Sequence, residues 1–397
     1  MTSIRLGFPD NMLEHIVIVG GGGTGGALAH DLTLRGFRVT LFEKGELLSG
    51  TTGRHHGLLH SGARYAVNDP VAAVECIEEN RILRKIAPEA FEQNDGLFVA
   101  IDDEDMAFRP LFLEGCRACG IPVQEMTPAA ALAREPALHP GLKSAVRVPD
   151  ATMDVWRLPM HFFATARANG ADIQPFTEVI GFQTRNGGIT AVETVDQRTG
   201  GRRSYRCNMV VNAAGPWAGK LAALAGLSLP LQLGPGVMVA VEGRVTDMVI
   251  NRLHPAGEGD IIIPQRLLSL LGTTLWLAPD PDVLSPPADQ RRRIIDLCGR
   301  IVPAVREKPV RSVWWAVRPL MADDGAKDPQ AITRDFGCID HSERDHLEGL
   351  ISVIGGKATT LRAMAETAAD LICKKTGRNL PCRTRESKLL PYRLFYK

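Results

Sequence analysis

The feature that most constrains this chain is a glycine-rich window, residues 20–26, that directly follows an apolar β-branched run at residues 16–19. Such a run is typical of a buried parallel strand, and the residues after the glycines favour a helix. Gly20, Gly22 and Gly25 fit the pattern G-x-G-x-x-G. In that pattern the glycines allow a tight turn, a close approach of backbone to a pyrophosphate, and close packing of helix on strand. The helix N-terminus then offers free N–H groups and partial positive charge to phosphates.

A second apolar strand is predicted at residues 39–42, and it ends in Glu43. This acid follows Gly25 by roughly 20 residues, the spacing expected of a carboxylate that accepts hydrogen bonds from ribose hydroxyls. The glycine pattern alone is weak evidence. Strand, helix, second strand and terminal acid in the right order predict a dinucleotide site, and a plain glycine-rich turn is the alternative.

Length and charge set the class of protein. A chain of 397 residues can bury a large core and is expected to form two domains. The net charge of +1 argues against a nucleic-acid partner. No apolar run is long enough to span a bilayer, and residues 1–14 lack the apolar core of a secretory signal. We therefore expect a cytoplasmic protein, with peripheral contact at the inner face of the cytoplasmic membrane as an alternative.

The cysteines do not predict a metal site. Of the eight, Cys116 and Cys119 alone form a C-x-x-C, and no second close pair is present to complete a four-cysteine zinc or iron–sulfur site. We expect ordinary reduced cysteines and no metal, and a redox or metal role for this pair is the alternative.

The pattern of elements predicts an α/β protein with a Rossmann-like dinucleotide domain built from separated segments and an inserted α+β substrate domain. A glycine turn between strand and helix occurs near both ends of the chain, whereas the middle contains short β-like runs. We assign residues 13–90, 145–228 and 325–382 to the first domain, 91–144 and 229–324 to the second, and 383–397 to a tail. Helices are predicted at 70–87, 111–120, 128–134, 155–168, 289–301 and 359–375, and strands at 96–101, 177–182, 189–196, 204–207, 209–212, 237–241, 260–263, 268–272 and 350–354.

Two adjacent segments after Glu43 are rich in groups that bind anions or move protons. Residues 49–54 contain three hydroxyls and two glycines, which suit a pyrophosphate, although a solvated turn is the alternative. Residues 55–65 contain three histidines, Arg64 and Tyr65 beside two leucines. Histidine exchanges protons near neutral pH, and arginine binds a phosphate or carboxylate through two parallel donors. This density of polar residues favours a pocket over isolated structural histidines.

Two further cations stand at the ends of apolar segments. Arg318 ends the run at residues 313–317, where burial without a partner is costly, so an anion is expected there and a structural salt bridge is the alternative. Lys357 follows the turn Gly355-Gly356 ahead of the last helix, within reach of a bound anion. The turn lacks the G-x-x-x-x-G-K-[ST] pattern, which excludes a Walker-type nucleoside triphosphatase.

These pieces in this order resemble the FAD-dependent glycerol-3-phosphate dehydrogenases, within the D-amino-acid-oxidase-like group of flavoproteins. The likeness is strongest to the catalytic A subunit of the anaerobic bacterial enzymes and covers most of residues 13–382. The segment ending in Ala63-Arg64-Tyr65 and the Gly355-Gly356-Lys357 element carry it most selectively. Other matching stretches are residues 17–31, 50–66, 94–99, 148–158, 210–217, 260–264, 271–274, 317–320 and 354–362.

The resemblance implies FAD as cofactor and assigns roles by position. His60, Arg64, Tyr65, Arg318 and Lys357 match the catalytic positions. Arg64, Tyr65, Arg318 and Lys357, together with Asp260, match the substrate positions, although membrane-bound relatives have a histidine where this chain has Asp260. The cofactor would contact Gly20, Gly22, Thr24, Gly25, Glu43, Lys44, Ser49, Thr51, Thr52, His56, Gly57, Leu58, Ala214, Gly215, Trp217, Gly355, Gly356, Lys357, Ala358 and Thr359.

The implied reaction is oxidation of sn-glycerol 3-phosphate to dihydroxyacetone phosphate, with hydride passing from C2 to flavin N5 and His60 or His56 taking the hydroxyl proton. Electrons would go to a quinone or a separate electron-transfer subunit. The catalytic chain of the anaerobic enzymes continues into a cysteine-containing domain beyond the flavin core, and we do not expect such a domain in residues 383–397. One alternative is a 2-hydroxy-acid or amino-acid dehydrogenase or oxidase of the same group. Another is a flavin-binding subunit for assembly or electron relay without turnover of its own.

Overall fold

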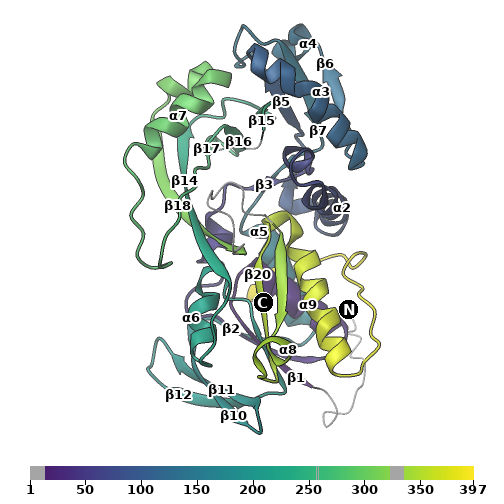
Figure 1. Cartoon of the computed structure of the whole chain (residues 1–397), viewed down its shortest axis with the longest axis vertical. Coiled ribbons are helices and arrows are strands. Elements are labelled where there is room, and N and C mark those ends of the chain that lie inside the picture. Colours follow the sequence, from purple (N-terminus) through teal and green to yellow (C-terminus); the bar gives the residue numbers. More distant parts are fainter. Residues whose placement is uncertain (1–13, 256, 258, 322–334) are drawn as a thin grey trace.

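Two β-sheets organise the computed structural model, which describes residues 14–255, 257, 259–321 and 335–397. Within these residues, the sheet in the lower half of Figure 1 has six strands in the order β19-β20-β13-β1-β2-β9. Its strands are parallel except for β19 at one edge. Their bounds are β1 His15–Val19, β2 Arg38–Phe42, β9 Asp172–Gln174, β13 Met209–Asn212, β19 Phe336–Asp340 and β20 Leu350–Gly355.

Both faces of this sheet are covered, which explains the continuous β-branched run in β1. Ile16 and Ile18 belong to a core that includes Leu28 of helix α1 (Gly23–Leu34). Helix α1 packs against α5 (Arg157–Ala168) and α9 (Leu361–Lys375) on that side. Val17 and Val19 instead belong to a core on the opposite face, formed with the three-stranded sheet of β10 (Thr177–Arg185), β11 (Gly188–Asp196) and β12 (Arg202–Arg206), and with α6 (Ala218–Ala223).

The second large sheet forms the upper half of the molecule (Figure 1). Among the described residues it has eight strands in the order β18-β14-β17-β16-β15-β5-β7-β6. One face packs on α7 (Gln290–Ile301) and α4 (Pro128–Arg134), and the other on α2 (Pro70–Ile86) and α3 (Asp103–Ala118). The strands are β5 Gly96–Ala100, β6 Gln124–Met126, β7 Ser144–Val148, β14 Leu231–Glu242, β15 Val249–Arg252, β16 Ile261–Gln265, β17 Leu268–Gly272 and β18 Val310–Met321.

A small sheet and several 3-10 turns complete the fold. The small sheet has the order β3-β8-β4 and contains β3 Leu58–Leu59, β8 Ala151–Met153 and β4 Phe91–Glu92. The short helix α8 (His341–Asp345) joins β19 to β20. The 3-10 turns are η1 Thr51–Arg54, η2 Ala63–Tyr65, η3 Pro88–Ala90, η4 Gly215–Trp217, η5 Pro303–Glu307, η6 Ala358–Thr360 and η7 Tyr392–Tyr396.

The predicted α/β class with a Rossmann-like parallel sheet is confirmed. The predicted start of α2 is also confirmed, because the Asp69 side chain accepts a hydrogen bond from Ala72 N ahead of Pro70. The predicted start of the next helix, at residue 111, was wrong. Helix α3 begins at Asp103 rather than at residue 111, because Asp102 caps it, acidic residues fill its first turn, and Pro110 lies inside the helix rather than ahead of it.

Exposed or irregular strands were predicted least well. Strand β12 begins two residues earlier than expected, and its exposed side chains give no apolar alternation. Strand β14 is longer than the predicted strand at residues 237–241, and β18 was not predicted as a strand, because the two strands pair with each other along their length. The domain boundaries stay a prediction, and those at residues 13 and 324–325 lie outside the described residues.

The tail at residues 383–397, which the sequence left unassigned, folds back on α5. Leu390 O lies 2.7 Å from His161 Nδ1, and Phe395 O accepts a hydrogen bond of 2.7 Å from Arg167. Phe395 joins the core beside α1 and α5. No described helix is long and apolar enough to cross a bilayer.

Candidate functional site: a cavity between the two sheets

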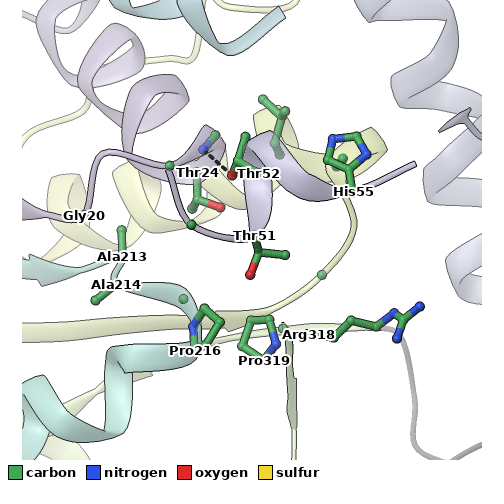
Figure 2. Close-up of a pocket in the computed structure, with 18 of the residues that line it drawn as sticks. Gly20, Thr24, Thr51, Thr52, His55, Ala213, Ala214, Pro216, Arg318 and Pro319 are labelled. Carbon is green, nitrogen blue, oxygen red and sulfur yellow. Dashed lines mark hydrogen bonds between the residues drawn. The ribbon is translucent and has the colours of Figure 1, made fainter. Parts of the chain in front are cut away.

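A cavity of 1280 Å³ lies where the carboxyl ends of β1 and β2 meet the eight-stranded sheet. Figure 2 shows the glycine turn and Ala213 toward one end of it, and Arg318 and His55 toward the other. Most of the predicted site residues line it: Gly20, Gly22, Thr24, Glu43, Lys44, Ser49, Thr51, Thr52, His56, Leu58, His60, Arg64, Tyr65, Ala214, Gly215, Trp217, Arg318, Gly355, Gly356, Lys357 and Ala358. Four predicted residues are outside its lining: Gly25, Gly57, Asp260 and Thr359.

The three glycines of the turn differ in what surrounds them. Gly20 has a φ of +122°, and a Cβ on it would stand 2.4 Å from Ala213 O. A Cβ on Gly25 would stand 2.0 Å from Gly20 O, so this glycine permits close helix–strand packing from behind the cavity wall. A Cβ on Gly22 would meet only Thr52 Oγ1, at 3.2 Å, and would project where a bound group needs room. These are the surroundings that a dinucleotide-binding turn requires.

The N-terminus of α1 is electrostatically suited to a pyrophosphate. Its N-cap, Gly22, offers no side chain, and its first turn contains no acidic residue. Thr52 Oγ1 accepts a hydrogen bond of 3.0 Å from Gly23 N, drawn dashed in Figure 2. The remaining positive end of the helix faces the cavity, where an anion is stabilised.

Glu43 is fixed at the end of β2 by two backbone donors. Its Oε2 accepts from Gly21 N at 2.7 Å, and its Oε1 accepts from Gly45 N at 2.9 Å. Each carboxylate oxygen can accept a further hydrogen bond, so the group can still receive ribose hydroxyls. Beside it, Lys44 Nζ lies 4.5 Å from the centre of the Trp217 ring.

The loop at residues 49–54 is hydrogen-bonded to the eight-stranded sheet. Thr51 Oγ1 donates to Val317 O of β18 at 2.5 Å, and Trp314 Nε1 donates to Arg54 O at 2.7 Å. The proton of Thr51 is therefore used within the protein. This contact places the loop next to Arg318, one residue after Val317.

The three histidines of residues 55–65 form a run of rings along the cavity. Ring centres are 6.3 Å apart for His55 and His56, 6.2 Å for His56 and His60, and 5.3 Å for His60 and Tyr65. Burial lowers the pKa of His55 to about 4. Burial, then Arg64 and Lys357, lower the pKa of His60 to about 3. All three rings, including that of His56, are therefore uncharged at neutral pH.

Three cations from distant segments converge on these histidines. Burial and then the neighbouring histidines, with Arg318 and Arg64, lower the pKa of His56, while Arg64 and Lys357 act on His60. Arg318 donates to Gly234 O at 3.2 Å, Thr274 O at 3.3 Å and Thr273 Oγ1 at 3.2 Å. Lys357 Nζ lies 5.4 Å from the centre of the Tyr65 ring. This end of the cavity is built to receive an anion.

Asp260 and Thr359 support the cavity from behind. Asp260 is buried and accepts from Arg64 Nη2 at 3.2 Å, so the structure places it against a cation of the site rather than in the cavity lining. Thr359 Oγ1 accepts from the backbone N of His60 at 3.1 Å. Both residues hold neighbours of the cavity in position.

Several lining residues were missed by the sequence reasoning. Arg54 and His55 line the cavity but were not assigned a role, although both lie within segments that were singled out. Thr273, Thr274 and Gly257 also line it. Thr273 and Thr274 lie in the stretch at residues 271–274 that matches the family but were assigned no role, whereas Gly257 lies in none of the matching stretches.

Among the described residues, no group of three or more His, Cys, Asp or Glu side chains is arranged to hold a metal. Cys116 and Cys119 are buried. Burial raises the pKa of the Cys116 thiol to about 12, so it is protonated at neutral pH. A protonated thiol is a poor metal ligand and a poor nucleophile.

Comparison with known proteins agrees with this geometry. A family model described as FAD dependent oxidoreductase (DAO) matches residues 15–371. The chain is 40% identical over 385 residues to the A1 subunit of anaerobic glycerol-3-phosphate dehydrogenase from Haloferax volcanii, covering 94% of this chain and 66% of that one. It is 36% identical over 382 residues to the A subunit of the Escherichia coli K12 enzyme, covering 96% and 70%. It thus spans about two thirds of the length of these relatives.

Solved structures show the same fold. The FAD complex of glycerol-3-phosphate dehydrogenase from Bacillus halodurans superposes with a TM-score of 0.72 at 24% identity, covering 96% of this chain and 68% of that one. Glycine oxidase from Geobacillus kaustophilus gives 0.73 at 23% identity, covering 94% and 98%. Enzymes named for different substrates therefore share this architecture, so the fold alone does not identify the substrate.

Proposed function

The chain belongs to the FAD dependent oxidoreductase family, and from this premise we propose that it oxidises sn-glycerol 3-phosphate to dihydroxyacetone phosphate. The observation that carries the proposal is the convergence of Arg64, Arg318 and Lys357 on the histidine end of the cavity. The names of the relatives at 36% and 40% identity support the same substrate.

The residues around the glycine turn would hold FAD. The N-terminus of α1, whose first turn has no acidic residue, and the loop at residues 49–54 suit its pyrophosphate, and the Glu43 carboxylate suits its ribose. When bound, FAD supplies the acceptor for the hydride that leaves C2 of the substrate. The chain's own residues would bind both molecules, orient the substrate and hold the proton of its hydroxyl group.

The three cations would bind the substrate phosphate. A charge-assisted hydrogen bond contributes about 1.5–3 kcal/mol, so two or three of them account for firm binding of a dianion. Arg64 donates to Gly257 O and to the buried Asp260, and Arg318 donates to Gly234 O and Thr273 Oγ1, so these contacts orient the two guanidinium groups.

The neutral ring of His60 would orient the substrate hydroxyl. Because its pKa lies near 3, it offers a lone pair that accepts a hydrogen bond from the hydroxyl at neutral pH. Thr359 fixes the backbone of His60, and Tyr65 packs beside its ring. The hydroxyl is thereby held while C2 faces the flavin.

Electrons would leave to a quinone or to a separate electron-transfer protein. The two relatives are named as the A1 and A subunits of their enzymes, which supports an assembly of several chains. The alternative substrate is a 2-hydroxy acid or an amino acid. Its support is that Arg318 suits a carboxylate as well as a phosphate and that glycine oxidase shares the fold.

The test is an anaerobic spectrum of the purified protein with FAD bound. We expect sn-glycerol 3-phosphate to bleach the oxidised flavin without any partner protein, and glycine, L-proline and lactate to leave it unchanged. Bleaching by an amino or hydroxy acid instead would replace the proposed substrate. Bleaching by dithionite but by no substrate would favour a flavin-binding subunit without turnover.

A further inference from the structure

One connection of the eight-stranded sheet reaches the other half of the molecule. It consists of residues 276–282, which follow β17 and are called the strap below. Trp276 N donates to Pro235 O at 3.1 Å, and Ala278 N donates to Leu233 O at 3.0 Å. Both acceptors belong to β14. The first half of the strap is therefore fixed to the eight-stranded sheet.

The second half of the strap is bound through two carboxylates to elements that follow β13. Asp282 accepts from Trp217 Nε1 of η4 at 2.8 Å and from Lys220 Nζ of α6 at 2.7 Å. Asp280 accepts from the same Lys220 Nζ at 2.9 Å and from Asp282 N at 2.8 Å. The hydrogen bond from Lys220 lowers the pKa of the Asp282 carboxyl, so the ion pair is complete at neutral pH. These four side chains, called the clasp below, join the two halves of the molecule.

The clasp separates the cavity from solvent. Trp217, Lys220 and Asp282 all line the cavity. The side chains of Lys220 and Asp282 are nevertheless each 49% exposed, so the ion pair between them contacts the cavity on one side and water on the other. A large ligand that crosses the wall of the cavity at this place must first break that pair.

The clasp lies at the end of the cavity that contains the glycine turn. The ring of Trp217 shows this, because Lys44 Nζ lies 4.5 Å from the ring centre and a Cβ on Gly50 would stand 3.3 Å from the ring. Lys44 follows Glu43, the carboxylate suited to the ribose of FAD, and Gly50 lies in the loop suited to its pyrophosphate. The clasp thus adjoins the part of the cavity that suits the nucleotide half of the cofactor.

We propose that the strap closes this end of the cavity over bound FAD, and that the clasp determines how fast FAD leaves. An exposed ion pair contributes little to the stability of a whole fold. Here the pair joins a connection of one sheet to a helix beside the other, so breaking it opens the wall of the cavity without unfolding either sheet. The proposal depends on the cofactor of the family and not on the identity of the substrate.

The first experiment dilutes the FAD-loaded protein and follows the release of FAD by flavin fluorescence. We expect Asp282→Asn to release FAD about 5-fold faster than the unmodified protein at low salt, which is the effect of losing one exposed ion pair. Added salt should narrow this difference, because it screens exposed charges. Glu242→Gln is the matched control. It breaks an ion pair with Arg311 of similar exposure outside the cavity lining, and it should release FAD at the unmodified rate.

A double variant tests whether the two charges act together. If Lys220 and Asp282 hold the strap as one clasp, the variant with Lys220→Met and Asp282→Asn should release FAD no faster than Lys220→Met alone. If the two effects instead multiply, to about 25-fold for two 5-fold effects, each side chain contacts FAD independently and the clasp is overturned.

The second experiment observes the strap itself. Hydrogen–deuterium exchange of the backbone amides of residues 276–282 is measured in the FAD-loaded protein. We expect faster exchange in Asp282→Asn than in the unmodified protein or in Glu242→Gln, because the strap opens more often. Faster release of FAD with unchanged exchange would mean that Asp282 holds FAD directly, and would overturn the strap. Unchanged release of FAD would overturn it as well.

The outcome is independent of the proposed function, because neither experiment uses sn-glycerol 3-phosphate. If this substrate does not bleach the unmodified protein, only the proposed function fails. If the clasp variants release FAD at the unmodified rate, only the strap proposal fails.

Discussion

The two ends of the cavity are built in different ways. At the glycine end, the contacts are mostly between backbone atoms and a few side chains, and the carboxylate of Glu43 is held by two backbone N–H groups. At the histidine end, charged side chains arrive from residues 64, 318 and 357, which are far apart in the chain.

The two ends should therefore respond to different kinds of substitution. The glycine end depends on the absence of side-chain atoms, so a single added methyl disrupts it. The histidine end depends on charges that the fold collects and on imidazoles that it keeps neutral, so it is sensitive to charge and pH. The following changes test this contrast, beginning with the largest expected effect.

Substituting Gly25 by alanine should disrupt the glycine end. The added Cβ would stand 2.0 Å from Gly20 O, a clash between backbone-linked atoms that nothing can relieve cheaply. We expect the free energy of unfolding to fall by about 3 kcal/mol or more and FAD to be lost on gel filtration. Gly219→Ala, within α6, is the matched control, because its Cβ would stand 3.8 Å from the Leu231 side chain, which is an ordinary contact. Retention of FAD by Gly25→Ala would contradict the packing argument.

Substituting Arg318 by alanine should affect the other end alone. Loss of one charge-assisted contact of about 1.5–3 kcal/mol corresponds to a rise in KM for sn-glycerol 3-phosphate of roughly 10- to 100-fold. FAD should stay bound, as measured by visible absorbance after dialysis. The KM of Arg318→Lys should lie between those of the unmodified protein and of Arg318→Ala. Loss of FAD with unchanged substrate kinetics would assign Arg318 to the cofactor end instead.

The buried histidines should make the protein sensitive to acid. Because the pKa of His60 is lowered to about 3, the unfolded chain binds a proton at this residue near pH 6.5 and the folded chain does not. Its contribution to stability is therefore present at neutral pH and is lost as pH falls below about 6.5, by about 1.4 kcal/mol per pH unit. Urea unfolding at several pH values measures how the free energy of unfolding changes with pH. This change should be smaller in His60→Asn than in the control His346→Asn, whose residue is exposed. Equal slopes would mean that His60 is not buried in the neutral form.

The smallest effect is expected at Thr52. Its hydroxyl accepts from Gly23 N at the start of α1, a contact that resembles a helix cap. Thr52→Val should cost about 1 kcal/mol, whereas Thr52→Ser keeps the acceptor and should stay close to the unmodified protein in thermal unfolding. If serine and valine behave alike, the hydroxyl contributes nothing to the turn.

Local patterns predicted one end of the cavity better than the other. The strand, turn, helix and second strand around Gly20 and Glu43 were predicted because their contacts lie within about one βαβ unit. Many of the residues at the histidine end were also predicted, but from a family resemblance rather than from spacing. Arg54 and His55 also line the cavity but were assigned no role.

The role of Asp260 was also predicted only by resemblance, and its surroundings in the structure indicate a different role. A carboxylate at that place suggested substrate contact, whereas the structure sets it behind Arg64 and against His254. Gly25 and Thr359 likewise support the cavity without lining it. Whether a residue lines a cavity or supports it depends on neighbours that come from other segments.

The sequence by itself determined the βαβ unit, the class of cofactor and the kinds of charged side chain available, because glycine geometry and hydrophobic periodicity act over a few residues. Only the tertiary structure decided that residues 64, 318 and 357 share one end of a cavity and that Arg64 pairs with the buried Asp260 behind it. Electrostatic interactions depend on distance through space and on burial, and neither quantity exists until the two sheets have packed together.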